Sequence, residues 1–158
     1  MTKPNHSRRD RTTANILVGI QVVLIVLLVG LPARQDWRVS TAMTTATTML
    51  TLTALALGLW AAFHLGRGLT PSPLPNGSTE LVTAGPYRFV RHPMYSAVIL
   101  WSFGSVLASG SVAKVAAAGA LLTLFLFKSR WEEQRLAASF DGYAAYMERS
   151  GRFVPSVG

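Results

Sequence analysis

The sequence contains no cysteine and only seven acidic residues among 158. The lack of cysteine excludes disulfides, thiolate metal sites and a cysteine nucleophile. Fifteen lysines and arginines outnumber the acids, giving a formal net charge of +8, while half of all residues are apolar. The basic residues flank apolar runs, as in membrane proteins, and do not gather on a soluble face that would bind nucleic acid. We therefore expect a single domain, residues 1–158, that is an integral membrane protein without a nucleic-acid partner or a metal.

Uncharged runs in the sequence predict about four membrane spans. The first two, Ile16 to Leu31 and Ala42 to Leu65, approach or reach the length that crosses a bilayer of about 30 Å. The alternative for the first is a cleaved signal peptide, although the run is long and "GLPARQ" is a poor cleavage site. Two shorter runs, Met94 to Ala108 and Val112 to Phe127, are separated by a turn-like stretch. The expected fold is an all-α polytopic membrane protein.

The lysines and arginines predict the topology of these spans. With four spans, both termini and the loop after residue 66 lie on one side, and that side carries twelve of the fifteen. The other side carries the remaining three: Arg34, Arg38 and Lys114. Because basic residues accumulate in cytoplasmic segments, both termini and the loop are expected to be cytosolic, in an inner or plasma membrane.

The stretch "GPYRFVRHPMY", residues 85–95, places dense polar chemistry against the third apolar run. Pro93 suits the first position of a helix, whose free N–H groups attract anions. Arg91, His92 and Tyr95 add hydrogen-bond donors at the same point, which favours a site for a carboxylate or phosphate. The alternative is that the two arginines anchor to anionic lipid headgroups while the two tyrosines form an interfacial belt.

The fourth span is expected to continue as a helix into the cytosol through "KSRWEEQRLAASF". Glu133 falls on an otherwise apolar stripe of this helix, which favours a functional role over a structural one. Its neighbour Glu132 lies within a turn of Lys128 and Arg135, where an ordinary surface ion pair is expected. The stripe that contains Glu133 has steps of three and four residues: Leu122, Leu126, Ser129, Glu133, Leu136 and Phe140.

Small residues recur at a spacing of four in the third and fourth apolar runs. Gly104 with Ala108, and Ala116 with Ala120, have small-xxx-small spacing, which predicts a tight hairpin of the third and fourth helices. A cofactor groove along this surface is the alternative.

Near the C-terminus, "YAAYMER" predicts a short amphipathic helix with Asp141 as its N-cap and an end at Gly151. Tyr143 and Tyr146 share a face of it and could pack on the tail or line a pocket.

Three motifs, "LVTAGPYRFVRHPMY", "WEEQRL" and "FDGYAAYMERSGRFVP", together resemble the isoprenylcysteine carboxyl methyltransferase family and related phospholipid N-methyltransferases. The resemblance covers Thr70 to Pro155. It implies an all-helical membrane enzyme that binds S-adenosylmethionine at the cytosolic interface and admits a lipophilic acceptor sideways from the bilayer. Residues 1–66 would then supply two N-terminal spans, and residues 67–158 would form the cofactor-binding catalytic core.

The resemblance also assigns roles to individual residues. Those expected to bind the cofactor are Tyr87, Arg91, His92, Tyr95, Glu132 and Glu133. Those expected to bind the acceptor are Arg88, Tyr143, Tyr146 and Arg152. The expected catalytic residues are Arg91, His92 and Glu133. One departure is Ala97, which stands where the family commonly has glycine two residues after the motif tyrosine.

The cofactor is zwitterionic and needs partners of both signs. We expect Glu133 to face its amino or sulfonium end, while His92, Tyr95 and the helix start hold its carboxylate. Arg149, like the arginines assigned above, could orient an anionic acceptor.

The acceptor stays open among an isoprenylcysteine-type carboxylate, a lipid amine and a thiol, including small molecules. Two alternatives to methyl transfer also remain. Sterol reductase-like membrane enzymes share an RHPxY element and use NADPH, and a non-enzymatic small membrane protein would bind neither cofactor.

Overall fold

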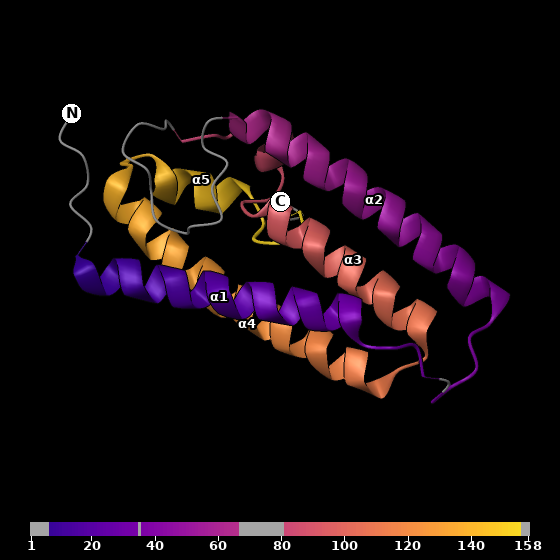
Figure 1. The fold of residues 1–158 in the computed structure, drawn as a ribbon. Coiled ribbons are helices and arrows are strands. Elements are labelled where there is room, and N and C mark those ends of the chain that lie inside the picture. The colour runs from indigo at the N-terminus through magenta and orange to yellow at the C-terminus, as the bar shows by residue number, and fades with distance from the viewer. Residues whose placement is uncertain (1–6, 35, 67–80, 156–158) are drawn as a thin grey trace.

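The computed structural model describes residues 7–34, 36–66 and 81–155. Its helices are α1 (Arg8–Gly30), α2 (Thr41–Leu65), α3 (Pro93–Ser109), α4 (Val112–Ser139) and α5 (Tyr143–Arg149), with a 3₁₀ turn, η2 (Gly85–Arg88), before α3. In Figure 1, α1 lies along α4 and α2 lies along α3, while α5 sits where α1 begins and α4 ends. The predicted all-α fold is confirmed.

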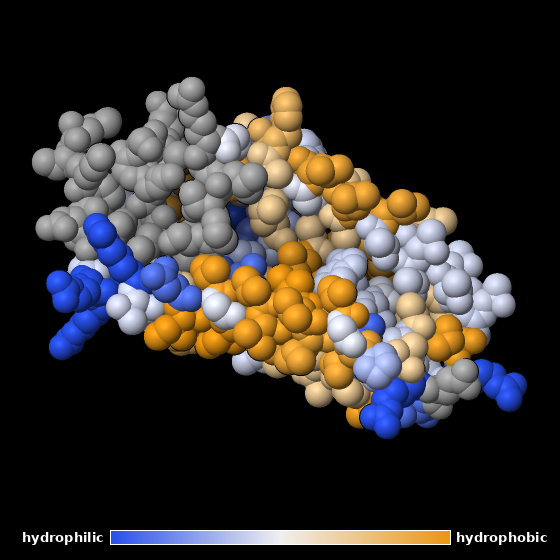
Figure 2. All heavy atoms as spheres, viewed as in Figure 1, coloured by the Kyte–Doolittle hydropathy of each residue, from blue (hydrophilic) through white to orange (hydrophobic). Residues whose placement is uncertain are grey.

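The lengths of the helices and their exposed apolar side chains are those of a membrane protein. The helices α1, α2 and α4 are long and apolar enough to cross a bilayer, whereas α3, with 17 residues, is a shorter apolar helix. Large apolar side chains such as Val26, Leu59 and Phe63 are exposed along α1 and α2. Figure 2 shows apolar residues covering the middle of the molecule and hydrophilic ones at its ends. Exposed apolar area on this scale is favourable only where lipid covers it.

The helix α4 is continuous from the membrane into the charged segment, as expected. Its apolar run ends at Phe127, and residues 128–139 form a polar extension. Lys128 Nζ donates to Gln21 Oε1 of α1 at 2.6 Å. Arg135 pairs with Asp10 of α1, so the ion pair expected between Arg135 and Glu132 is wrong. These contacts tie α1 to the α4 extension at two points, Asp10 and Gln21.

The small residues of α3 pack against α2. Thr47 Oγ1 donates to the Gly104 carbonyl at 3.2 Å. A Cβ on Gly58 would lie 3.6 Å from that of Ala97. Ala116 and Ala120 are exposed. The expectation that small residues would bring the third and fourth helices together is therefore wrong, since those of α3 bring it against α2.

The loop after α1 covers the α3–α4 turn. Arg34 N–H donates to the Ser109 carbonyl at 3.0 Å, and Asp36 N–H donates to the Gly110 carbonyl at 2.9 Å. The Asp36 carboxylate accepts from Val112 N–H at 2.9 Å and so satisfies the start of α4. Gly110 has a φ of 56°, which favours glycine.

We predict that Gly110→Ala lowers the free energy of unfolding by about 2 kcal/mol, because the left-handed backbone is strained for alanine. The added Cβ would also lie 2.8 Å from the Trp37 carbonyl oxygen. Thermal unfolding in detergent measures the change. Gly119→Ala is the control, because a Cβ there meets nothing within 4 Å. Equal stability of the two variants would contradict the prediction.

Candidate active site

The C-terminal tail pairs with the backbone just before α3. Gly151 N–H donates to the Phe89 carbonyl at 3.0 Å, and Arg91 N–H donates to the Gly151 carbonyl at 2.8 Å. His92 N–H continues this pairing by donating to the Arg152 carbonyl at 3.1 Å. Two of the three sequence motifs are therefore joined directly through their main chains.

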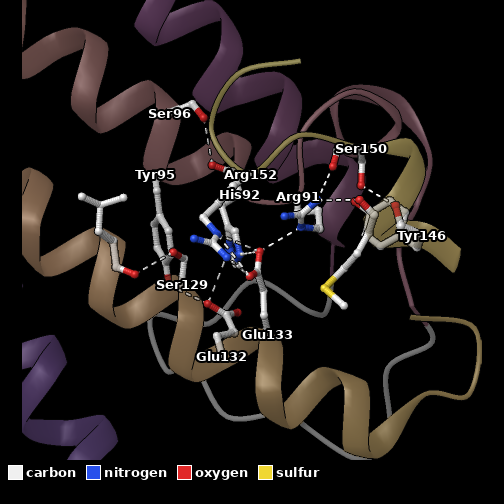
Figure 3. Close-up of polar contacts among 12 residues, drawn as sticks. Arg91, His92, Tyr95, Ser96, Ser129, Glu132, Glu133, Tyr146, Ser150 and Arg152 are labelled. Atoms are coloured by element: carbon white, nitrogen blue, oxygen red, sulfur yellow. Dashed lines mark hydrogen bonds and ion pairs between the residues drawn. The ribbon is translucent and has the colours of Figure 1, made fainter. Parts of the chain in front are cut away.

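Glu133, from the remaining motif "WEEQRL", lies at the centre of this assembly (Figure 3). Arg91 Nε donates to Glu133 Oε1 at 2.8 Å, and Arg152 donates to Glu133 Oε2 through Nη2 at 2.6 Å and Nε at 3.1 Å. His92 Nε2 lies 3.3 Å from Oε1. Because Glu133 is only 5% exposed, its carboxylate is almost wholly enclosed by these three side chains.

The side chains that enclose Glu133 determine its pKa. Burial by itself would raise the pKa of Glu133, but hydrogen bonds from His92, Arg152 and Arg91 outweigh burial and hold that pKa below its ordinary value. The hydrogen bond to Glu133 raises the pKa of Arg152. Glu133 is therefore ionised at neutral pH, with its charge compensated within the protein.

Arg91 also fixes the end of α5. Its Nη1 donates to the Met147 carbonyl at 3.0 Å and to the Ser150 carbonyl. Only 10% of its side chain is exposed. A planar guanidinium can donate hydrogen bonds to all of these acceptors at once. A lysine ammonium cannot donate in the same directions. Arg91 therefore joins the RHP stretch, the α4 extension and the tail.

The second glutamate of the pair is more accessible than the first. Tyr95 Oη donates to Glu132 Oε2 at 2.9 Å, and His92 Nδ1 lies 3.7 Å from the same oxygen. The Glu132 side chain is 23% exposed, against 7% for Glu133. Glu132 is thus the carboxylate with surface left for a ligand.

Aromatic rings hold His92 and Tyr95 in place. The two rings are stacked with centroids 5.2 Å apart, and Tyr95 also stacks on Phe125 with centroids 4.6 Å apart. Phe153 from the tail meets His92 edge-on at 6.1 Å. Pro93 begins α3, as the sequence predicts, with His92 as the N-cap.

The tyrosines of α5 differ from each other. Tyr146 Oη donates to the Tyr87 carbonyl at 2.6 Å. Tyr143 Oη is buried and has no hydrogen-bond partner among the described residues. Burial raises the pKa of Tyr146 to about 12 and raises that of Tyr143 as well, so both are neutral hydrogen-bonding groups. A buried hydroxyl without a partner is one that a ligand can satisfy.

We predict that Tyr146→Phe lowers the free energy of unfolding by about 1–3 kcal/mol, because the buried Tyr87 carbonyl loses its donor. Tyr143→Phe is the matched control and should cost nothing, since its hydroxyl makes no such bond. Thermal unfolding of both variants in the same detergent tests this. Equal losses for the two would contradict it.

Most of the residues singled out from the sequence meet here, and two expectations about the ends of α5 need correction. Arg88 is exposed on the surface, with its guanidinium 5.9 Å from the Phe89 ring centroid, outside the cluster around Glu133. The N-cap of α5 is Gly142 and makes no side-chain bond, so Asp141 as N-cap is wrong. The helix ends at Arg149 with Ser150 as its C-cap, before the expected Gly151.

Sequence reasoning missed Ser96 and the carbonyls that bind Arg91. Ser96 Oγ donates to the Phe153 carbonyl at 2.7 Å and holds the tail on α3. Its position one turn after His92 is a signal that could have identified it. Carbonyl acceptors such as those of Met147 and Ser150 carry no side-chain signature.

A comparison with family models identifies the family, and three relatives are similar to this chain. The model of the phospholipid methyltransferase family matches residues 42–142, which include the RHP stretch and the acidic pair. The nickel-cobalt-cadmium resistance protein NccN of Alcaligenes xylosoxydans xylosoxydans is 32% identical over 147 residues, covering 89% of this chain and 62% of NccN. The cobalt-zinc-cadmium resistance protein CzcN of Cupriavidus metallidurans is 33% identical over 111 residues, covering 69% of this chain and 50% of CzcN.

A plant enzyme is also similar. Protein-S-isoprenylcysteine O-methyltransferase B of Arabidopsis thaliana is 34% identical over 80 residues, covering 49% of this chain and 41% of the enzyme. The chain thus spans between about two fifths and three fifths of the length of these relatives. Within the described segments, no group of three or more histidine or acidic side chains is placed to hold a metal ion.

Proposed function

Because this chain belongs to the phospholipid methyltransferase family, we propose that it transfers a methyl group from S-adenosylmethionine to an acceptor at the membrane interface. When bound, this cofactor supplies an electrophilic methyl group on a sulfonium. The observation that carries the proposal is the convergence of the RHP stretch, the acidic pair and the C-terminal tail around Glu133. The family match also favours methyl transfer over the NADPH-dependent reductase and the non-enzymatic protein considered from the sequence.

The side chains at this point suit a zwitterionic ligand. Glu132 offers a partly exposed carboxylate for a positive group. Tyr143 offers an unpartnered buried hydroxyl, and Arg152, 30% exposed, carries positive charge at the same place. Partners of both signs are needed because the cofactor carries a sulfonium, an amino group and a carboxylate.

We propose different roles for the two glutamates. Glu133 has both oxygens engaged, so it organises Arg91, His92 and Arg152. Glu132 then faces the positive end of the cofactor, the role expected from the sequence for Glu133. A carboxylate that is already in position at a partly dry site stabilises the transition state, because the protein need not rearrange during the reaction.

In this proposal, His92 positions the two glutamates. Its two ring nitrogens face Glu132 and Glu133, and its ring lies against Tyr95, so it orients both carboxylates. An acceptor that is already anionic, a carboxylate or a thiolate, needs no general base, whereas an amine must first lose a proton. The proposal therefore favours an acceptor that is already ionised, a carboxylate or a thiolate, with Arg152 orienting it. Orientation and exclusion of water supply most of the rate.

We also propose that this end of the molecule faces the cytosol. The α4 extension lies beside the start of α1, because Arg135 of α4 pairs with Asp10 of α1. Figure 1 shows α5 at the same end of the molecule. Segments 1–15, 66–93 and 128–158 together carry twelve of the fifteen lysines and arginines, as cytosolic segments do.

Methyl transfer tests the function directly. The purified protein in nanodiscs is incubated with S-adenosylmethionine labelled in its methyl group and with three acceptors in turn: S-farnesylcysteine, an alkyl thiol and phosphatidylethanolamine. The S-farnesylcysteine methyl ester, whose carboxylate is blocked, is the control for the first acceptor. Transfer to the carboxylate or thiol is expected. No transfer to any acceptor from a folded sample would contradict the proposal.

A further inference from the structure

Gln21 is a polar side chain within the apolar stretch of α1, on the face that packs against α4. It lies four residues after Leu17 and seven before Leu28, both of which are buried, so the three share one side of the helix. Leu24 of the same helix packs against the core cluster that contains Phe125 of α4. A glutamine between membrane helices needs a polar partner from the protein, because the lipid hydrocarbon supplies none.

Gln21 meets Lys128 at the start of the α4 extension. Lys128 Nζ donates to Gln21 Oε1 at 2.6 Å, and Lys128 is only 1% exposed. The same ammonium lies over the Tyr95 ring, 5.2 Å from the ring centroid. The Tyr95 hydroxyl in turn donates to Glu132 at 2.9 Å. A series of contacts therefore connects α1 with the accessible carboxylate of the proposed site.

The ammonium of Lys128 also has an acidic neighbour on its own helix. Lys128 and Glu132 are four residues apart on α4, a spacing at which opposite charges pair across one helical turn. In the structure, Glu132 instead accepts from Tyr95 and faces His92, while Lys128 donates to Gln21 of α1. The acceptor on α1 thus holds the lysine charge on the side of α4 that faces α1.

We propose that Gln21 positions the Lys128 ammonium against α1 and so keeps the Glu132 carboxylate available for the positive group of the cofactor. The inference rests on the proposed methyl transfer and deepens it, because it gives α1 a part in cofactor binding. The family model begins at residue 42, so α1 lies outside the matched segment, whereas Lys128 and Glu132 lie within it. Gln21 and Lys128 are positioning residues, since they act through Glu132.

Removing the acceptor on α1 is expected to weaken cofactor binding. In Gln21→Leu, the ammonium loses a hydrogen bond at a buried position, where an unsatisfied charge is costly. It should then turn to Glu132, one helical turn away, and neutralise that carboxylate. Binding of S-adenosylmethionine, measured by calorimetry, should weaken at least about tenfold, because charges at a partly buried site interact more strongly than in water.

A second substitution distinguishes positioning from a structural defect. Adding Lys128→Met to Gln21→Leu should restore binding towards the wild-type affinity, because the competing cation is gone and methionine fills the space. A defect in the packing of α1 would not be relieved in this way. Asp10→Asn is the matched control, since it removes the pair with Arg135 that also ties α1 to α4. At about 1.5 Å per residue it lies about 16 Å along α1 from Gln21, and it should leave binding unchanged.

Fluorine NMR of the protein without cofactor separates this inference from the proposed function. The four tyrosines are replaced by 3-fluorotyrosine, and Tyr95→Phe assigns the resonance of Tyr95. Gln21→Leu should shift that resonance, because the ammonium leaves the ring. It should cause no shift when Lys128→Met is already present, since Gln21 acts through Lys128. Asp10→Asn should leave the resonance in place.

The two measurements together give distinct outcomes. Positioning is supported by a shifted Tyr95 resonance in Gln21→Leu together with binding that Lys128→Met restores. If the wild-type protein binds no S-adenosylmethionine but the resonances behave as expected, the positioning stands and the proposed function falls. A resonance or an affinity that Gln21→Leu leaves unchanged, or a loss of affinity that Lys128→Met does not relieve, overturns the positioning and leaves the proposed function in place.

Discussion

Replacing Glu133 with glutamine is expected to lower the free energy of unfolding by about 3–5 kcal/mol, because it removes the counter-charge of a buried network. Arg91, with 10% of its side chain exposed, would stay buried without an anionic partner. Arg152 would lose the bonds that hold the tail against α4. Thermal unfolding in detergent measures the loss, and faster tryptic cleavage after Arg149 and Arg152 reports release of the tail.

The control for this variant is Glu148→Gln, which removes an exposed glutamate from α5. It should leave both measurements unchanged.

The pH dependence of stability adds a second test. The pKa of Glu133 is lowered on folding, so its contribution to stability is present above the ordinary value of 4.5 and is lost as the pH falls towards the lowered pKa. Glu133→Gln should lack this component, and a variant with wild-type stability at neutral pH would refute the assignment.

Replacing Glu132 with glutamine is expected to leave the fold intact and to slow methyl transfer by about 100-fold or more, the effect typical of removing a preorganised electrostatic group. Glu132 is partly exposed, and glutamine retains an oxygen that can accept from Tyr95. The cost in stability should therefore stay within about 1 kcal/mol. Initial rates with labelled cofactor, together with thermal unfolding of the same preparation, measure both quantities.

The pair of glutamate variants separates the two proposed roles. If Glu132→Gln keeps wild-type turnover while Glu133→Gln is stable but inactive, then Glu133 faces the cofactor, as the sequence alone suggests. Loss of stability in Glu133→Gln combined with loss of turnover in a stable Glu132→Gln supports the roles proposed from the geometry.

The helices could be predicted from the sequence because their signals are local. Uncharged runs, Pro93 at the first turn of α3 and the absence of breakers after Phe127 depend on near neighbours alone. The helical position of Glu133 on an apolar stripe likewise predicted its burial, which the structure confirms. The family resemblance is confirmed by the match over residues 42–142.

The partners of these residues could not be predicted, because they depend on packing between distant segments. Helical spacing suggested an ion pair of Glu132 with Lys128 or Arg135, but docking of α1 brings Asp10 to Arg135. The stripe that contains Glu133 gave no indication that Arg91 and Arg152 would meet there, since the pairing of the tail with residues 89–92 brings them together. Packing of Gly104 on α2 is a similar outcome of tertiary contacts.

Calorimetric titration of the purified protein with S-adenosylmethionine, S-adenosylhomocysteine and NADPH tests the central claim most directly. We expect binding of both adenosyl ligands, weakened in Glu132→Gln and retained in Glu148→Gln, and no binding of NADPH. Binding of NADPH, or no binding of either adenosyl ligand to a folded sample, would contradict the methyltransferase assignment.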